Sequence, residues 1–427
     1  MAYIKNKKHS NLLRLDDDAV LSVWHKLQPI DRVQLASSCR RFRKIFEERD
    51  AAQYAIFKME TLWQVSVKDI DSYARLVAPL IQELRAYTPC VGNVRAKKFL
   101  KSMTGNCEPL RRVIFKGVRV AFQLFELLAN AKYLTELYLQ NCRLLDKDVD
   151  MITMLSNLMV LDLSKNNDIT GHGLNSLISL RALYLSNCKS LDPINLVHVF
   201  KSAKHLCILD IQQPYSNTNL VPIFLELGRY CRNLDKLRVT LPEHRRYESL
   251  ARLPKLTQIF AYGYVRRFLI DLRNHRAHHM QVIFLETLQQ VPIDATFMFT
   301  QFRELRKLAC DGDFDFTPGC IDGFENLRKL TCINLYKLDA LTPKDVLILL
   351  KKCPKLKFVQ LFFKVFITEA FIFELIEVLE KRPVKVNFVL NLQKSSIRRG
   401  ITKDPRYLAA SDFLHIIFSA QCVDWDK

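Results

Sequence analysis

The sequence predicts an α/β solenoid in which short parallel strands alternate with helices. Three observations predict this class. A nine-residue phrase, L-x-x-L-x-L-x-x-N/C, is repeated in succession from Leu134, Leu158 and Leu180. The copies recur about every two dozen residues, a period typical of stacked repeats. The segments between copies are amphipathic and long enough for two to three turns of helix.

The phrase has a physical explanation. Its second and third leucines, such as Leu137 and Leu139, alternate along a strand and therefore point to the same side. The last residue of each copy (Cys142, Asn166 or Cys188) turns the chain, and its side chain can bond backbone groups that the turn leaves open. One repeat cannot bury its apolar face alone, whereas stacked repeats can. The phrase and its period resemble those of leucine-rich repeats, which implies a right-handed solenoid with strands on its concave side and helices on its convex side.

Weaker copies of the phrase extend the array on both sides. The copies begin at Leu110, Leu134, Leu158, Leu180, Leu206, Leu234, Leu256, Met280, Leu305, Leu327 and Leu356. Helices are expected between them, at 121–131, 195–202, 221–230, 344–352 and 371–381. Two earlier strands are expected at 62–67 and 81–86, and a last strand at 386–390 closes the sheet. Pro214, Pro242 and Tyr264 replace the turn Asn or Cys after Cys188, so the later coils should be less regular.

The composition and the net charge limit the kinds of partner that the chain is expected to bind. The 427 residues are 49% apolar and carry a net charge of +20. Such a charge suggests acidic partners, but the basic residues are scattered along the sequence, so a solvated basic surface that only aids solubility is the favoured explanation. We therefore do not expect nucleic acid as the main partner. Charged residues interrupt the most apolar stretch, 358–378, so no membrane partner is expected.

The twelve cysteines are expected to be free thiols in a reducing cytoplasmic or nuclear compartment, because no apolar secretory segment follows Met1. No cysteine pair has zinc-ligand spacing. His275, His278 and His279 are expected in a solvated basic loop rather than at a metal. No phosphate-binding loop or nucleophile motif is present, and we expect neither a cofactor nor catalysis.

Residues 15–50 have the pattern of three short helices. Asp16 or Asp17 caps the first helix, Pro29 ends it, Asp31 caps the second, and a third is expected over 38–48. The segment resembles an F-box. The residues that carry the resemblance are Leu15, Asp18, Val20, Leu21, Leu27, Pro29, Asp31, Val33, Leu35, Cys39, Arg40 and Phe42. The cysteine form of the repeat likewise resembles that of F-box leucine-rich-repeat proteins. The alternative is a helical cap on the solenoid without an adaptor.

The resemblance implies a non-catalytic substrate-recognition adaptor of a Skp–cullin–F-box ubiquitin ligase. The residues implied to contact the Skp adaptor subunit are Leu15, Val20, Leu21, Trp24, Leu27, Pro29 and Leu35. The chain then divides into a flexible basic tail (1–14), an F-box (15–50), a connecting segment with the first repeats (51–109), the solenoid (110–391) and a C-terminal tail (392–427).

The target protein is expected on the concave face, where the residues flanking the inner leucines point. The middle residues of the phrase are Ile114, Tyr138, Asp162, Tyr184, Asp210, Arg238, Phe260, Phe284, Ala309, Thr331 and Gln360. The neighbouring columns add Glu136, Lys236, Tyr262, Lys307, Lys329, Phe358 and Phe362. Exposed aromatic residues beside cations are typical anchors of protein interfaces. The predicted substrate-binding residues are Tyr138, Tyr184, Lys236, Arg238, Phe260, Tyr262 and Phe284.

Two alternatives stay open. The C-terminal tail, with 413–418 and Trp425, would cover the aromatic residues if it lay across the concave face. In the second alternative, the whole chain is a scaffold that belongs to no ligase. This scaffold binds an acidic protein or a nucleic acid through its basic surface.

Overall fold

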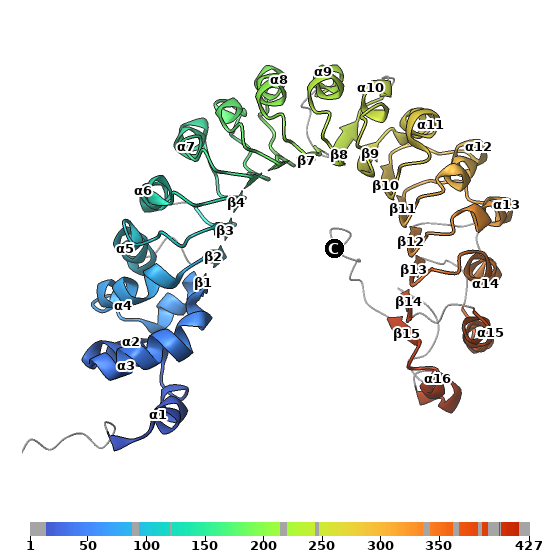
Figure 1. Ribbon diagram of the computed structural model, residues 1–427. Coiled ribbons are helices and arrows are strands. Elements are labelled where there is room, and N and C mark those ends of the chain that lie inside the picture. Colours follow the sequence, from blue (N-terminus) through green and yellow to red (C-terminus); the bar gives the residue numbers. More distant parts are fainter. Residues whose placement is uncertain are drawn as a thin grey trace, which may run out of the picture. The chain divides into compact units, whose positions relative to one another are not determined.

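The computed structural model describes residues 14–87, 94–119, 122–213, 220–243, 247–335, 342–361, 367–382, 387–391, 401 and 403–417. The chain forms two compact units. Unit 1 comprises Met1–Leu180 and Cys188–Leu191, and unit 2 comprises Arg181–Asn187 and Asp192–Lys427. In both units short strands alternate with helices that lie on one side of the strands (Figure 1), which confirms the predicted α/β class.

Unit 1 begins with three short helices, α1 (Asp17–Trp24), α2 (Pro29–Ser38) and α3 (Arg40–Ile45), followed by a π-helical turn, η2 (Phe46–Asp50). Asp16 caps α1 as expected, since its carboxylate accepts a hydrogen bond from the Ala19 N–H at 2.7 Å. Pro29 does not end α1, as the sequence suggested, but is the first residue of α2. Its fixed φ suits that position, where no N–H is needed. Asp31 consequently lies in the first turn of α2 and not at its cap.

The three helices have a core of their own. Val20 and Trp24 have no exposed surface, and the Trp24 ring lies 6.2 Å from that of Phe46. Arg32 donates hydrogen bonds to the carbonyls of Leu27 and His25, both at 3.0 Å, and so satisfies the end of α1. The same guanidinium lies 3.6 Å from the carboxylate of the buried Asp50, which links α2 to the chain that leads into the repeats.

The sheet of unit 1 is parallel, and each strand pairs with the next in the chain. Its strands are β1 (Ile56–Lys58), β2 (Glu83–Tyr87), β3 (Arg112–Lys116), β4 (Glu136–Gln140) and β5 (Val160–Asp162). The helices of these repeats are η3 (Ala51–Tyr54), η4 (Met59–Gln64), α4 (Ile70–Val77), η5 (Ala78–Leu80), α5 (Val94–Met103), α6 (Phe122–Asn130), α7 (Asp146–Ile152) and η7 (Leu174–Ser176).

The strand expected at 62–67 is wrong, because residues 62–64 belong to η4, no strand follows in 65–67, and the strand β1 precedes them. Leu62 and Val65, both 1% exposed, are three residues apart, a spacing that puts them on the same side of a 3₁₀ turn. The strand expected at 81–86 is confirmed by β2.

Unit 2 continues the same alternation with ten described strands in chain order. They are β6 (Ala182–Tyr184), β7 (Ile208–Ile211), β8 (Lys236–Leu241), β9 (Gln258–Gly263), β10 (Val282–Thr287), β11 (Lys307–Asp311), β12 (Cys332–Leu335), β13 (Phe358–Leu361), β14 (Phe388–Asn391) and β15 (Leu414–Ile417). The helices are α8 (Pro193–Ser202), α9 (Ile223–Tyr230), α10 (Glu248–Ala251), α11 (Val265–Arg276), α12 (Ile293–Thr296), η8 (Phe297–Gln301), α13 (Pro318–Asp322), η9 (Gly323–Asn326), α14 (Pro343–Lys352), α15 (Glu369–Glu380) and α16 (Pro405–Ala409).

The end of the array differs from the expectation. The strand expected at 386–390 corresponds to β14, but it does not close the sheet, because β15 pairs with it in parallel. The described part of the segment 413–418 is therefore mostly this last strand and not a chain that lies across the sheet. Trp425 and the rest of 418–427, most of the basic run 394–406, and the N-terminal residues 1–13 lie outside the described residues.

One repeat starts three residues later than the sequence suggested. Asn334, not Thr331, pairs with Ala309 and Gln360, so Leu330 and not Leu327 is the first leucine of that copy. Both leucines are fully buried, and each is followed by an apolar residue at the right spacing, so the phrase alone did not separate them. The predicted neighbour Lys329 consequently lies outside the sheet, where it pairs with Glu304.

The predicted role of the turn residue is clearest at Asn166, which is fully buried. Its side-chain amide donates to the carbonyls of Leu139 (2.8 Å) and Leu163 (2.7 Å). Its oxygen accepts from the N–H groups of Cys142 (2.9 Å) and Leu144 (3.1 Å). One side chain therefore satisfies four backbone groups from two neighbouring repeats.

After Cys188 the turns are made differently. Gln213 donates to the carbonyl of Leu185 at 2.9 Å, one residue before Pro214, which lies outside the described residues. Gly263 has a φ of +114°, and a Cβ there would lie 2.4 Å from the carbonyl oxygen of Leu241. Gly312 has a φ of +105°, and a Cβ there would lie 2.6 Å from the carbonyl oxygen of Thr287. Only glycine fits such a turn.

Replacing Asn166 with alanine should lower the free energy of unfolding by about 3 kcal/mol, because four buried backbone groups lose their partner at once. Urea unfolding followed by circular dichroism measures the change. Asn157→Ala is the matched control, since the exposed Asn157 amide donates only to the Lys132 carbonyl. It should change stability by no more than about 0.5 kcal/mol, and equal losses in the two variants would contradict the role of Asn166.

Candidate binding surface

We call the face of the sheet that points away from the helices the open face (Figure 1). In β4 the side chains alternate between half-buried and buried, and Glu136, Tyr138 and Gln140 belong to the open face. The register carries this division from strand to strand: Val113, Leu137 and Leu161 form one fully buried column, and their neighbours in each strand form the open-face columns.

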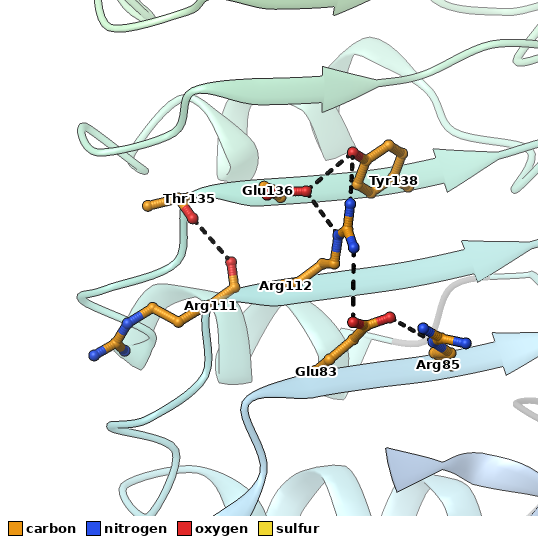
Figure 2. Close-up of polar contacts among 7 residues, drawn as sticks. All are labelled: Glu83, Arg85, Arg111, Arg112, Thr135, Glu136 and Tyr138. Atoms are coloured by element: carbon orange, nitrogen blue, oxygen red, sulfur yellow. Dashed lines mark hydrogen bonds and ion pairs between the residues drawn. The ribbon is translucent and has the colours of Figure 1, made fainter. Parts of the chain in front are cut away.

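On the open face of unit 1, Arg112 is the centre of a polar network (Figure 2). Its guanidinium lies 2.7 Å from the carboxylate of Glu136 and 3.7 Å from that of Glu83. It also donates to the Tyr138 hydroxyl at 3.3 Å, and this hydroxyl donates to Glu136 at 3.0 Å. Arg85 pairs with the other oxygen of Glu83. The cations and carboxylates of this cluster neutralise each other.

Burial raises the pKa of the Tyr138 hydroxyl above its ordinary value, so this group stays a hydrogen-bond donor at neutral pH. Tyr138 was predicted from the sequence, whereas Glu83, Arg85 and Arg112 were not. A clue was present: Arg112 and Glu136 occupy the same position of consecutive phrases with opposite charge, and in a parallel sheet such residues are neighbours.

On the open face of unit 2, two cations lie over an aromatic ring. The Phe260 ring centroid is 4.2 Å from the Arg238 guanidinium and 5.0 Å from the Lys236 ammonium. On the next strand, β10, the Phe284 ring stacks on the Phe260 ring, with ring centroids 5.9 Å apart and planes inclined by 22°. Tyr262 lies on the same strand as Phe260, two residues further on. Five of the seven predicted residues (Lys236, Arg238, Phe260, Tyr262 and Phe284) are thus brought together, on three adjacent strands.

These residues differ in how much surface they offer. Phe260 is 2% exposed and Lys236 is 8% exposed, so these two residues pack beneath the surface and offer a partner little contact area. Arg238 and Phe284 are half-buried and present part of their side chains. Tyr184, also half-buried, stands on β6, whose register pairs it with Asp210. Tyr138 belongs to unit 1 and forms part of the Arg112 network. Phe362, predicted as a neighbour, lies outside the described residues.

The residues predicted to contact an adaptor also fall into two groups. Val20 and Trp24 are fully buried and have no surface to offer. Leu15 is exposed, and Leu21, Leu27 and Leu35 are half-buried. Val23, which was not predicted from the sequence, lies on the same helix as Leu21 and is 39% exposed. Pro29 is described only as the first residue of α2.

No group of three or more His, Cys, Asp or Glu side chains that could hold a metal ion occurs among the described residues. The loop expected for the three histidines is confirmed for His278 and His279, which lie exposed in the turn after α11, but not for His275. Arg273, His275 and Arg276 belong to the last turn of α11, where positive charge suits the helix dipole. Arg276 is buried and donates to the carbonyls of Leu256 and Pro254, at 2.8 to 3.2 Å. It is a structural residue.

The ten described cysteines are free thiols, and most are buried. Burial raises the pKa of Cys142, Cys231, Cys332 and Cys353 to about 12. Such thiols are neutral at physiological pH and are poor nucleophiles and poor metal ligands. They act as small apolar side chains of the core.

The match to a known protein family agrees with the repeat architecture. The leucine-rich repeat family matches residues 132–189. Among curated proteins, none matches the sequence. An internalin from Listeria monocytogenes is similar in structure, with 15% identity and a TM-score of 0.43, over 89% of this chain and 97% of its own. A leucine-rich repeat protein from Leptospira interrogans has 15% identity and a TM-score of 0.39, over 81% of this chain and 92% of its own.

Among the described helices, none combines the length and the apolar character that crossing a membrane requires.

We predict that Cys142, Cys231, Cys332 and Cys353 resist thiol reagents at pH 8. With a pKa of about 12, only about one thiol in ten thousand is ionised there. Alkylation of the native protein followed by peptide mass spectrometry measures the labelling, and the same reaction in guanidinium chloride is the control. Rapid labelling of these four residues in the native protein would contradict their burial.

Proposed function

We propose that the chain is the substrate-recognition adaptor of a Skp–cullin–F-box ubiquitin ligase, in the cytoplasm or nucleus, and has no catalytic step of its own. A leucine-rich repeat array is suited to protein–protein binding, and the family match over residues 132–189 supports that general role. The observation that carries the finer proposal is the three-helix module directly ahead of the repeats, with an apolar surface of its own.

The docking surface for the Skp subunit consists of Leu15, Leu21, Val23, Leu27 and Leu35. These side chains are exposed or half-buried although they are apolar. The module does not need them for its own core, which is formed by Val20, Trp24 and Phe46. Apolar side chains that remain at the surface of a folded module are typical of an interface.

The target protein binds the open face of unit 2 at Tyr184, Arg238 and Phe284. Arg238 is held over Phe260, which is buried, so the guanidinium is fixed before a partner arrives. A fixed cation between half-buried aromatic rings suits a partner segment with acidic and apolar residues. The role of the chain is to raise the effective concentration of the target's lysines near the ubiquitin-conjugating enzyme.

The second candidate is a scaffold outside any ligase that binds an acidic protein or a nucleic acid. The net charge of +20 favours it. Co-purification with the Skp subunit separates the two candidates, because only the ligase adaptor needs that partner.

Leu27→Arg should abolish a 1:1 complex with the Skp subunit, because a charge would be buried without a partner. Val23→Arg tests the same surface at a more exposed position, where the module folds undisturbed. Size-exclusion chromatography of the co-expressed proteins measures the complex. Ile194→Arg, at a residue that is 65% exposed on α8, is the matched control and should leave the complex intact. Failure of the unmodified chain to form the complex would reject the ligase proposal.

Phe284→Arg should remove target capture and leave Skp binding unchanged, since the two surfaces belong to different units. Proximity labelling under proteasome inhibition, compared between the unmodified chain and the variant, measures the loss. Proteins that disappear with Phe284→Arg and persist with Ile194→Arg are the expected targets. An identical set of labelled proteins in all three would contradict the assignment of the open face.

A further inference from the structure

Exposed cations gather around one tyrosine at the end of α9 in unit 2. The Tyr230 ring centroid lies 4.8 Å from the Lys204 ammonium, 5.8 Å from that of Lys201 and 5.8 Å from the Arg229 guanidinium. The ring itself is half-buried, and the three cations are exposed. A tyrosine ring attracts cations through its negative face, so it holds these charges in place.

Two further cations extend the group. Arg232 lies two residues after the end of α9 and is exposed. Lys255 donates to the side-chain oxygen of Asn233 at 2.7 Å, and the nitrogen of the same amide donates to the carbonyl of Lys204 at 2.9 Å. Asn233 thus connects the loops of three consecutive repeats. We call Lys201, Lys204, Arg229, Tyr230, Arg232 and Lys255 the Tyr230 cluster.

The Tyr230 cluster lacks anionic partners of its own. Within the part of the chain that the structure describes, none of its five cations forms an ion pair. The nearby carboxylate of Asp235 accepts hydrogen bonds from Thr257 and Gln258 instead. Like charges that are held together without a carboxylate repel each other, and an external polyanion relieves that repulsion.

A groove with an apolar floor adjoins the cluster. It lies between α9 and α10, has a volume of about 710 Å³, and shares Arg229 with the cluster. Its other lining residues are Val221, Phe224, Leu225, Gly228, Glu248, Ser249 and Arg252. Gly228 allows the two helices to approach closely, because a Cβ there would lie 2.8 Å from the Ser249 carbonyl oxygen.

We propose that the Tyr230 cluster and the α9–α10 groove bind a single-stranded polynucleotide, with its phosphates on the cations and a base in the groove. The cations come from three consecutive repeats, which puts them over roughly 10 to 20 Å, the length of several nucleotides. A lone phosphate ion would need only one repeat. A run of acidic side chains would satisfy the charges, but none of them is a flat apolar group that could enter the groove.

Fluorescence anisotropy of the full chain with a fluorescein-labelled twelve-nucleotide single strand tests the proposal. Binding should weaken with salt, and the slope of log K against log salt should be about −3 for four to five phosphate contacts. The double variant K204E/R229E should bind at least about tenfold more weakly, with a slope shallower by about 1.4, because two contacts are lost. Lys97→Glu with Lys101→Glu, exposed cations on α5, makes the same charge change elsewhere and should preserve binding.

The groove is tested separately. Leu225→Asn removes an apolar side chain of the groove without changing the charge. It should weaken binding of the oligonucleotide several-fold and leave binding of inorganic polyphosphate unchanged, since polyphosphate has no bases. Equal weakening by the α5 control would show that only net charge matters and would overturn the proposal. Equal or tighter binding of a twelve-residue polyglutamate peptide, or of vesicles that contain phosphatidylserine, would also overturn it and identify an acidic protein or a membrane surface as the ligand.

Discussion

Parallel pairing in unbroken register is the constraint on which each unit depends. In unit 1, Val113 pairs with Leu137 and Leu137 with Leu161, so the buried side chains of neighbouring repeats form one column. Because side chains alternate along a strand, a slip of one residue would turn this column to the open face. Asn166 opposes such a slip, since its four hydrogen bonds fit only one register. The open-face clusters follow from the same register.

Much of this architecture is contained in the leucine phrase. The strands after Leu134, Leu158 and Leu180 begin two residues into the phrase, and the described helices lie within a few residues of the expected segments. The phrase fails where apolar residues satisfy it twice, as at Leu327 and Leu330. Both leucines are fully buried, although one directly follows η9 and the other precedes β12 by two residues. It also says nothing of atypical first repeats such as β1.

The candidate surfaces were harder to predict, because they depend on neighbours that the sequence separates by a whole repeat. The phrase correctly grouped Arg238, Phe260 and Phe284, but it did not reveal that Phe260 is buried beneath the cations. The Tyr230 cluster looked like scattered charge, since its members are spread over 201–255. They meet because the ends of successive helices lie side by side in a repeat array, a proximity that sequence distance hides.

The pairing of each strand with its chain neighbours within a unit has a mechanical consequence. Tension applied along the stacking direction separates one pair of strands after another. The hydrogen bonds of the different strand pairs are therefore broken in sequence and not all at once in shear. A coil at the end of a unit can peel away while the coils behind it keep their contacts, because each touches only the next. Such an array yields gradually when it is stretched and re-forms coil by coil when it is released.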